Sequence, residues 1–210
     1  EPQAISRRSL PRAKSRGSGQ ADRKPQVEIK EIDFYKDKAK SFIIESRDFS
    51  IYIDPSKGGI IRELDHRGVS ANLTNTIARH EEEYHKKILA KMGKSKDAAI
   101  ARTIHEDVKP IDPGLKSEFC YDNYIRGCLV DHFMDKITGI DAFTDCKYNE
   151  RGDFVNAVYK AKKEKDKVVL AREGSVGGRR LAITKEIKLK DKKQIEIFYT
   201  LKNLSNKPFD

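Results

Sequence analysis

Cysteines are scarce in this sequence. Only Cys120, Cys128 and Cys146 occur among 210 residues, and none of them belongs to a CxxC pair. An odd number at this spacing argues against a disulfide framework and favours a reducing compartment, so we expect a cytoplasmic protein. Because no compact group of Cys and His residues is present, a tetrahedral zinc site is not expected. The sequence predicts neither a bound metal nor any other cofactor.

Long apolar runs and catalytic motifs are also missing. The longest apolar runs extend about four residues, as at 127–130 and 168–171, far short of the ~20 that a membrane-spanning helix needs. No apolar segment typical of a signal peptide lies near the first residue. The sequence has no GxSxG, P-loop, HExxH or GxGxxG pattern, so no enzyme class follows from a motif. We expect no membrane partner.

Charge is what the sequence has in excess. Lys and Arg number 43 against 33 Asp and Glu, which gives a formal net charge of +10. Half of this charge lies in residues 1–30, where eight basic residues stand against three acidic ones. The segment is rich in Ser, Gly, Pro and Gln, so burial of apolar surface cannot offset the entropy of ordering it. We predict a disordered basic linker or tail over 1–26 and one domain over 27–210.

The basic tail has two interpretations. Clustered arginines can form an arm that binds nucleic acid, and a basic nucleic-acid-binding protein is therefore one alternative. However, no aromatic residue lies among these arginines to stack on bases. Beyond residue 30 the remaining charge of +5 is spread over 180 residues. We favour a solvated linker and expect no nucleic-acid partner.

Alternating apolar and polar residues indicate strands through most of 27–210. Phe49, Ile51 and Ile53 alternate with polar neighbours, and a turn-forming stretch at 54–59 follows them. Further segments of this kind occur at 60–64, 155–161, 168–172, 181–189 and 195–201. Short strands joined by polar turns predict a mainly β protein, an antiparallel sandwich or barrel. Lysines and glutamates are expected on the outer faces, although Lys185 lies in step with apolar residues.

One stretch has helical spacing instead. We predict a helix over about 72–88, with Asn72 or Thr74 as its N-cap, and a second short helix at 98–104. The fold would thus carry one or two short helices in an insertion near 72–105. On such a helix Glu81 or Glu82 shares a face with His85, which suits a metal-ligating or acid–base pair. A surface ion pair is the commoner outcome of this spacing.

A second polar cluster occupies 121–133. It contains Asp131 and His132 side by side after an apolar segment. Neighbours on a strand point to opposite faces, so these two side chains are not expected to form a dyad. We expect His132 to be buried and hydrogen-bonded.

Several short motifs occur in a fixed order along the chain. They are Lys-Gly-Gly at 57–59, Glu-Leu-Asp at 63–65, Asn-Leu-Thr-Asn-Thr at 72–76, then Arg79, Glu82, Tyr84 and His85, and Asp-His-Phe at 131–133. Their order and spacing resemble the C-terminal domain of glycoside hydrolase family 57 α-amylases and 4-α-glucanotransferases. The resemblance covers roughly residues 27–210.

The resemblance implies a β-sandwich similar to galactose mutarotase. In such enzymes the sandwich follows a catalytic barrel on the same polypeptide, and the catalytic Glu and Asp lie in that barrel. No residue of this chain is therefore expected to be catalytic. The expected role is packing against the barrel and contributing to the groove for an α-glucan, namely starch, glycogen or maltooligosaccharide. The parent enzyme would be a retaining hydrolase or transferase of α-1,4-glucans.

Seven residues are candidates for contacts with carbohydrate or with the barrel, because tyrosine stacking and charged hydrogen bonds suit both. They are Arg79, Glu82, Tyr84, His85, Arg126, Asp131 and His132. Of the two roles, the domain interface is slightly favoured. The chain closes on Pro-Phe-Asp without a closing strand, so we expect the sandwich to be truncated at its C-terminus. The alternative is a free-standing mutarotase-like epimerase, with His66, His85 or His132 and a carboxylate as acid and base.

Overall fold

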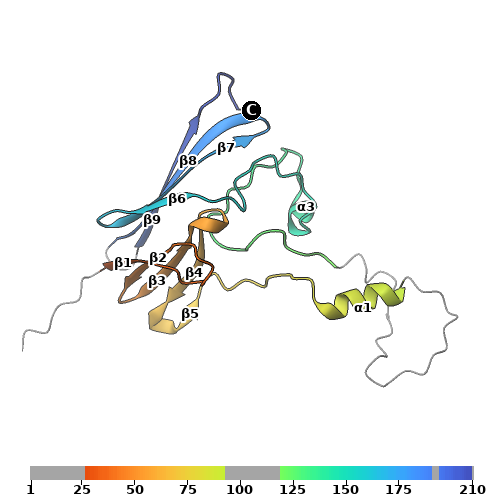
Figure 1. Ribbon diagram of the computed structural model, residues 1–210, viewed down its shortest axis with the longest axis horizontal. Helices are drawn as coiled ribbons and strands as arrows, with labels where there is room; N and C mark the ends of the chain where they lie inside the picture. The colour runs from red at the N-terminus through yellow and green to blue at the C-terminus, as the bar shows by residue number, and fades with distance from the viewer. Residues whose placement is uncertain (1–26, 93–118, 191–193, 210) are drawn as a thin grey trace, which may run out of the picture.

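Two antiparallel sheets form the body of the protein. The computed structural model describes residues 27–92, 119–190 and 194–209, and Figure 1 shows one sheet lying across the other. The first sheet has the strand order β1-β2-β3-β4-β5 and the second has the order β6-β7-β8-β9. Every neighbouring pair within the two sheets is antiparallel.

The regular elements of the described residues follow in chain order. The strands are β1 (Val27–Ile32), β2 (Ser41–Ser46), β3 (Phe49–Asp54), β4 (Ile60–His66), β5 (Ala71–Asn72), β6 (Lys160–Lys163), β7 (Lys167–Val176), β8 (Arg179–Lys190) and β9 (Gln194–Asn203). Two 3-10 helices, η1 (Pro55–Lys57) and η2 (Arg67–Val69), and two α-helices, α1 (Glu83–Met92) and α3 (Ile140–Thr144), complete them. None of these helices is long and apolar enough to cross a membrane.

The core takes side chains from both sheets. Ile44 and Ile51 enter it from the first sheet, and Leu170 and Ile183 enter it from the second. Burial alternates along β8, as a strand with one face in the core requires. The predicted antiparallel β-sandwich is confirmed. The 155–161 segment was expected to be a strand throughout, but β6 begins only at Lys160.

The turn between β3 and β4 forms as its composition predicts. Asp54 accepts hydrogen bonds from the backbone N–H of Ser56 at 2.9 Å and from its hydroxyl at 2.7 Å, which starts η1. Gly58 ends η1 at φ 96°, and a Cβ there would lie 2.1 Å from the carbonyl oxygen of Val155. Only glycine fits this position, because it combines a left-handed backbone with a close neighbour. The turn is thereby fixed against the 154–159 loop.

The predicted helix over 72–88 is wrong in its first half, because α1 begins only at Glu83. Asn72 and Thr74 do not cap a helix. The Thr74 hydroxyl donates to the carbonyl of Arg62 and accepts from the N–H of Leu64, both at 3.2 Å, and thus holds this segment against β4. Side-chain hydrogen bonds of this kind compete with helix formation. The helix predicted at 98–104 lies outside the described residues, and α3 was not predicted.

Candidate functional site

A buried carboxylate joins two of the seven candidate residues. Asp122 accepts hydrogen bonds from Nε of Arg79 at 3.0 Å, from its Nη2 at 2.7 Å and from its backbone N–H at 2.8 Å. Nη2 of Arg126 reaches the same carboxylate at 2.9 Å. Burial alone would raise the pKa of Asp122, but the hydrogen bonds from Arg79 and Arg126 outweigh it and lower this pKa. Arg79, Arg126 and Asp122 thus form a clamp, which joins the chain at residue 79 to the 122–126 loop.

A polar pocket of about 460 Å³ lies beside this clamp. It is lined by Arg62, Glu63, Asn72, Thr74, Asn75, Thr76, Ala78, His80, Tyr124, Ile125 and Arg126. Strands β4 and β5 supply one wall, and the 74–80 and 124–126 segments supply the rest. The lining residues include a hydrogen-bond donor in Arg126, an acceptor in Glu63 and an aromatic residue in Tyr124. Such a mixture can bind a neutral ligand that is rich in hydroxyl groups.

The other candidates of the 79–85 segment gather around His85. Its ring lies 4.2 Å from the ring of Tyr84 and 4.7 Å from that of Phe119, measured between centroids. Nδ1 of His85 lies 3.1 Å from the hydroxyl of Tyr121 and accepts the backbone N–H of Glu82 at 3.2 Å. The carboxylate of Glu82 is thus not what contacts His85. The contact between Glu82 and His85 is made by the backbone at the start of α1.

Asp131 lies against Lys185, which occupies a position of the strand where the alternating pattern has apolar residues. Lys185 is 0% exposed, and its Nζ lies 2.7 Å from the carboxylate of Asp131. The same Nζ donates to the carbonyls of Gly58 and Gly59, both at 3.0 Å, and of Leu129 at 2.7 Å. The expectation that lysines occupy outer faces is therefore wrong at this position. A buried charge is tolerated here because it is paired and fully hydrogen-bonded.

Two tyrosines complete the hydrogen bonding of Asp131. Tyr159 donates its hydroxyl to one carboxylate oxygen, and Tyr199 donates to the other at 3.2 Å. Burial and then Asp131 raise the pKa of both tyrosines, so both stay neutral donors. Burial lowers the pKa of Lys185, and Asp131 opposes that change. We call Lys185, Asp131 and Tyr159 the buried cluster, and Tyr199, which is 40% exposed, bonds Asp131 from the outer side. These contacts occupy both oxygens of the Asp131 carboxylate.

His132 occupies a separate environment. Its Nδ1 lies 2.9 Å from the carboxylate of Glu150 and 3.1 Å from the hydroxyl of Tyr148. The rings of Tyr124 and Phe143 pack against it, 4.7 Å and 5.3 Å away. Asp131 and His132 have different partners, so the prediction that they form no dyad is confirmed. His132 is largely buried, but among the described residues its Nε2 has no hydrogen-bond partner.

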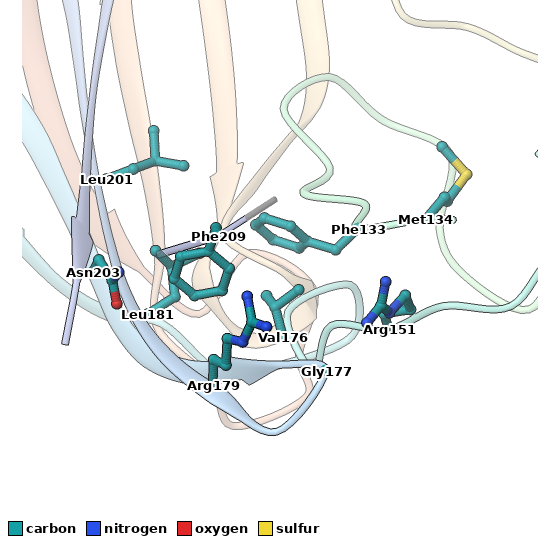
Figure 2. Close-up of a pocket in the computed structure, with 10 residues that line it drawn as sticks. All are labelled: Phe133, Met134, Arg151, Val176, Gly177, Arg179, Leu181, Leu201, Asn203 and Phe209. Carbon is teal, nitrogen blue, oxygen red and sulfur yellow. The ribbon is translucent and has the colours of Figure 1, made fainter. Parts of the chain in front are cut away.

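A second cavity, of about 430 Å³, lies at the far end of the second sheet. Figure 2 shows Phe133 and Phe209 projecting into it, with Arg151 and Arg179 below them and Leu201 of β9 on one side. None of the seven candidate residues lines this cavity. Among the described residues no group of three or more His, Cys, Asp or Glu is placed to hold a metal ion.

The structure therefore divides the seven candidates. Arg79 and Arg126 share one carboxylate. Tyr84 contacts the ring of His85 edge to face at the start of α1, where the backbone of Glu82 also bonds His85. Asp131 and His132 are enclosed separately. Sequence reasoning missed the contributions of Asp122, Tyr124 and Lys185. Lys185 alone carried a signal, because a lysine at an apolar position of a strand needs a buried partner.

Comparisons with known proteins agree in pointing to one group. Residues 33–209 match the family described as alpha-amylase/4-alpha-glucanotransferase, C-terminal. The 4-alpha-glucanotransferase of Thermococcus litoralis is 35% identical over 154 residues, which are 73% of this chain and 23% of the relative. That of Thermococcus kodakarensis is 30% identical over 161 residues, 77% and 24% of the two chains.

A solved structure gives the same result. The crystal structure of the Thermococcus litoralis 4-alpha-glucanotransferase superposes with a TM-score of 0.68 at 27% identity, covering 87% of this chain and 25% of that chain. An alpha-amylase of Pyrococcus abyssi is 31% identical over 167 residues, 80% of this chain and 25% of the relative. The chain spans about a quarter of the length of the relatives it matches.

Proposed function

The chain belongs to the alpha-amylase/4-alpha-glucanotransferase C-terminal family, and we propose that it is the non-catalytic accessory domain of a family 57 enzyme that processes α-1,4-glucans. Its partners would be a catalytic barrel of the same polypeptide and a glucan such as starch, glycogen or maltooligosaccharide. The names of the relatives and the share of their length that the chain spans support this proposal. A cytoplasmic location belongs to the proposal and is favoured by three free cysteines.

The polar pocket is the observation that carries the glucan part of the proposal. A glucan chain presents many hydroxyl groups, each of which donates and accepts hydrogen bonds. Arg126 faces the pocket while Asp122 fixes its guanidinium, so the donor is held in place before a sugar arrives. Tyr124 lines the same wall. Of the seven candidates, Arg126 is the one we assign to sugar contact.

The 73–85 segment carries the domain-interface part of the proposal. Ile77 is 86% exposed, and Leu73 and Tyr84 are exposed as well. Figure 1 shows α1 standing away from both sheets. Exposed apolar side chains on such a projection are typical of a surface that another domain covers. We assign Arg79, Glu82, Tyr84 and His85 to contact with the catalytic barrel, while Asp131 and His132 support the loops from inside.

Titration with maltoheptaose tests the sugar contact directly. Backbone amide shifts of the labelled 210-residue chain should change at 74–80 and 124–126 as the sugar is added. Arg126→Ala should weaken binding at least tenfold, because a hydrogen bond to a charged group contributes about 1.5–3 kcal/mol. Asn75→Ala, which lines the pocket without holding Asp122, should weaken it less.

Arg47→Ala is the matched control, since Arg47 is exposed at the other end of the first sheet and pairs only loosely with Asp48. It should leave the titration unchanged. Shift changes confined to residues outside the polar pocket, or equal binding by Arg126→Ala and Arg47→Ala, would remove the glucan part of the proposal.

A further inference from the structure

Glu150 is a partly buried carboxylate that holds the chain on both sides of His132. One of its oxygens, Oε1, accepts the backbone N–H of Phe133 at 2.8 Å and that of Gly152 at 3.1 Å. The other oxygen, Oε2, lies 2.9 Å from Nδ1 of His132. Because a carboxylate can only accept hydrogen bonds, Nδ1 carries the proton that joins the two groups. Glu150 therefore fixes both the backbone next to His132 and the orientation of its ring.

The opposite edge of the imidazole has no comparable support. Among the described residues Nε2 of His132 has no hydrogen-bond partner, although the atom is buried. The hydroxyl of Tyr148 lies 3.1 Å from Nδ1, on the same edge of the ring as Glu150. The rings of Tyr124, Phe143 and Tyr148 contact the imidazole edge to face, with centroids 4.7 to 5.6 Å away. In the described part of the chain, hydrogen bonding thus orients the ring through Nδ1.

Tyr124 connects the imidazole of His132 to the polar pocket. The two rings cross at an interplanar angle of 71°, and Tyr124 also lines the pocket together with Ile125 and Arg126. An edge-to-face contact depends on orientation, because the edge of an aromatic ring is positive and its face is negative. A rotation of the imidazole therefore moves Tyr124 or removes the contact that holds it.

We propose that Tyr124 contacts the glucan in the polar pocket, and that Glu150 and His132 are positioning residues that hold Tyr124 for this contact. The proposal rests on the proposed function, since it assigns a further sugar-contact residue to the same pocket. Neither Glu150 nor His132 is among the described residues that line the pocket, so both act through Tyr124. A side chain that is held in place before the sugar arrives loses less entropy on binding, and the affinity rises accordingly.

Glu150→Gln disturbs the positioning without removing bulk. The amide oxygen of glutamine can still accept the N–H groups of Phe133 and Gly152, but its amide nitrogen then faces the N–H of His132. Two donors that face each other force the imidazole to turn or to move its proton to Nε2. In nuclear magnetic resonance spectra of the 210-residue chain, the ring signals of Tyr124 should shift. Maltoheptaose should bind about threefold to tenfold more weakly.

A second substitution shows whether Glu150 acts through Tyr124. Tyr124→Ala should itself weaken binding, and in that background Glu150→Gln should cause no further loss. A general effect of Glu150 on the fold would instead lower the affinity by the same factor in both backgrounds. Glu173→Gln is the matched control, because it removes the same charge from an exposed ion pair with Arg180. It should change neither the ring signals of Tyr124 nor the affinity.

The outcomes separate this proposal from the proposed function. If the chain binds maltoheptaose but Tyr124→Ala or Glu150→Gln binds it equally tightly, the positioning proposal is overturned and the glucan pocket remains. Equal losses from Glu150→Gln in the two backgrounds would overturn it as well, whereas a chain that does not bind maltoheptaose removes both. Circular dichroism verifies the fold of each variant. Should Glu150→Gln not fold, His132→Phe replaces it, because phenylalanine keeps a ring beside Tyr124 but has no N–H for Glu150.

Discussion

Replacing Lys185 by methionine isolates the contribution of its charge. Methionine has a similar length and no charge, so Lys185→Met leaves little cavity at this position. It removes the cation beside Asp131, while Tyr159 and Tyr199 keep donating to that carboxylate. It also removes the donor that three backbone carbonyls share, those of Gly58, Gly59 and Leu129.

The expected cost follows from these contacts. Breaking a buried ion pair from one side destabilises a protein by about 3–5 kcal/mol, because the other charge stays buried without compensation. The orphaned carbonyls act in the same direction, whereas the favourable burial of a thioether opposes the loss. We expect the free energy of unfolding to fall by about 4 kcal/mol, which lowers the melting temperature of a chain of this size by roughly 8–16 °C.

Urea unfolding followed by far-ultraviolet circular dichroism measures the change, since the chain has no tryptophan to report by fluorescence. Lys188→Met is the matched control on the same strand, because Lys188 forms a surface ion pair with Asp166 at 2.7 Å. That pair should contribute less than about 1 kcal/mol. Adding Asp131→Asn to Lys185→Met should recover part of the loss.

A Lys185→Met chain no less stable than the Lys188→Met chain would refute the reasoning. It would mean that the dehydration of Lys185 and Asp131 cancels everything that the buried cluster contributes. Equal stability of Lys185→Met and the double variant would likewise contradict the assigned coupling between the two charges.

Two further changes test other parts of the fold. Because Arg79 and Arg126 hold the pKa of Asp122 below its unfolded value, the stabilisation by this carboxylate is present above about pH 4 and lost as the pH falls through its folded pKa. Asp122→Asn should therefore cost about 3 kcal/mol at pH 7 and flatten the decline of melting temperature below pH 4. Gly58→Ala should destabilise the chain by more than about 2 kcal/mol, through backbone strain and the clash with Val155. Gly178→Ala, at φ 77° with open space around it, should cost only about 1 kcal/mol in the same melting experiment.

The strands were predictable because burial of one face imposes a period of two that the sequence carries locally. Segments 49–53, 181–189 and 195–201 lie within β3, β8 and β9, respectively. The helix over 72–88 was mispredicted because the apolar spacing there is local, whereas the bonds of Thr74 to β4 are tertiary. Tertiary contacts of this kind override the helix propensity of a segment when they satisfy more polar groups than a helix cap would.

The candidate site was harder to predict because its partners are distant in sequence. Arg79 and Asp122 are 43 residues apart, and Lys185 and Leu129 are 56 apart. No periodicity within one element connects such residues, and a single sequence carries no record of which pairs meet. Family resemblance supplied the candidate segments, and the geometry then separated their residues: Arg79 and Arg126 hold Asp122, Tyr84 and His85 contact each other, and Asp131 and His132 are enclosed in different environments.

The buried cluster also sets an order of events during synthesis. The carbonyls of Gly58 and Gly59 accept hydrogen bonds from Lys185, which is 127 and 126 residues further along the chain and is therefore synthesised later. At a translation rate of about 5–20 residues per second, the β3–β4 hairpin is made roughly 6–25 s before its cation emerges. Contacts of such long range are slow to form, so closure of the sandwich is a late step. During that interval the apolar face of the first sheet is open to chaperones and to neighbouring nascent chains.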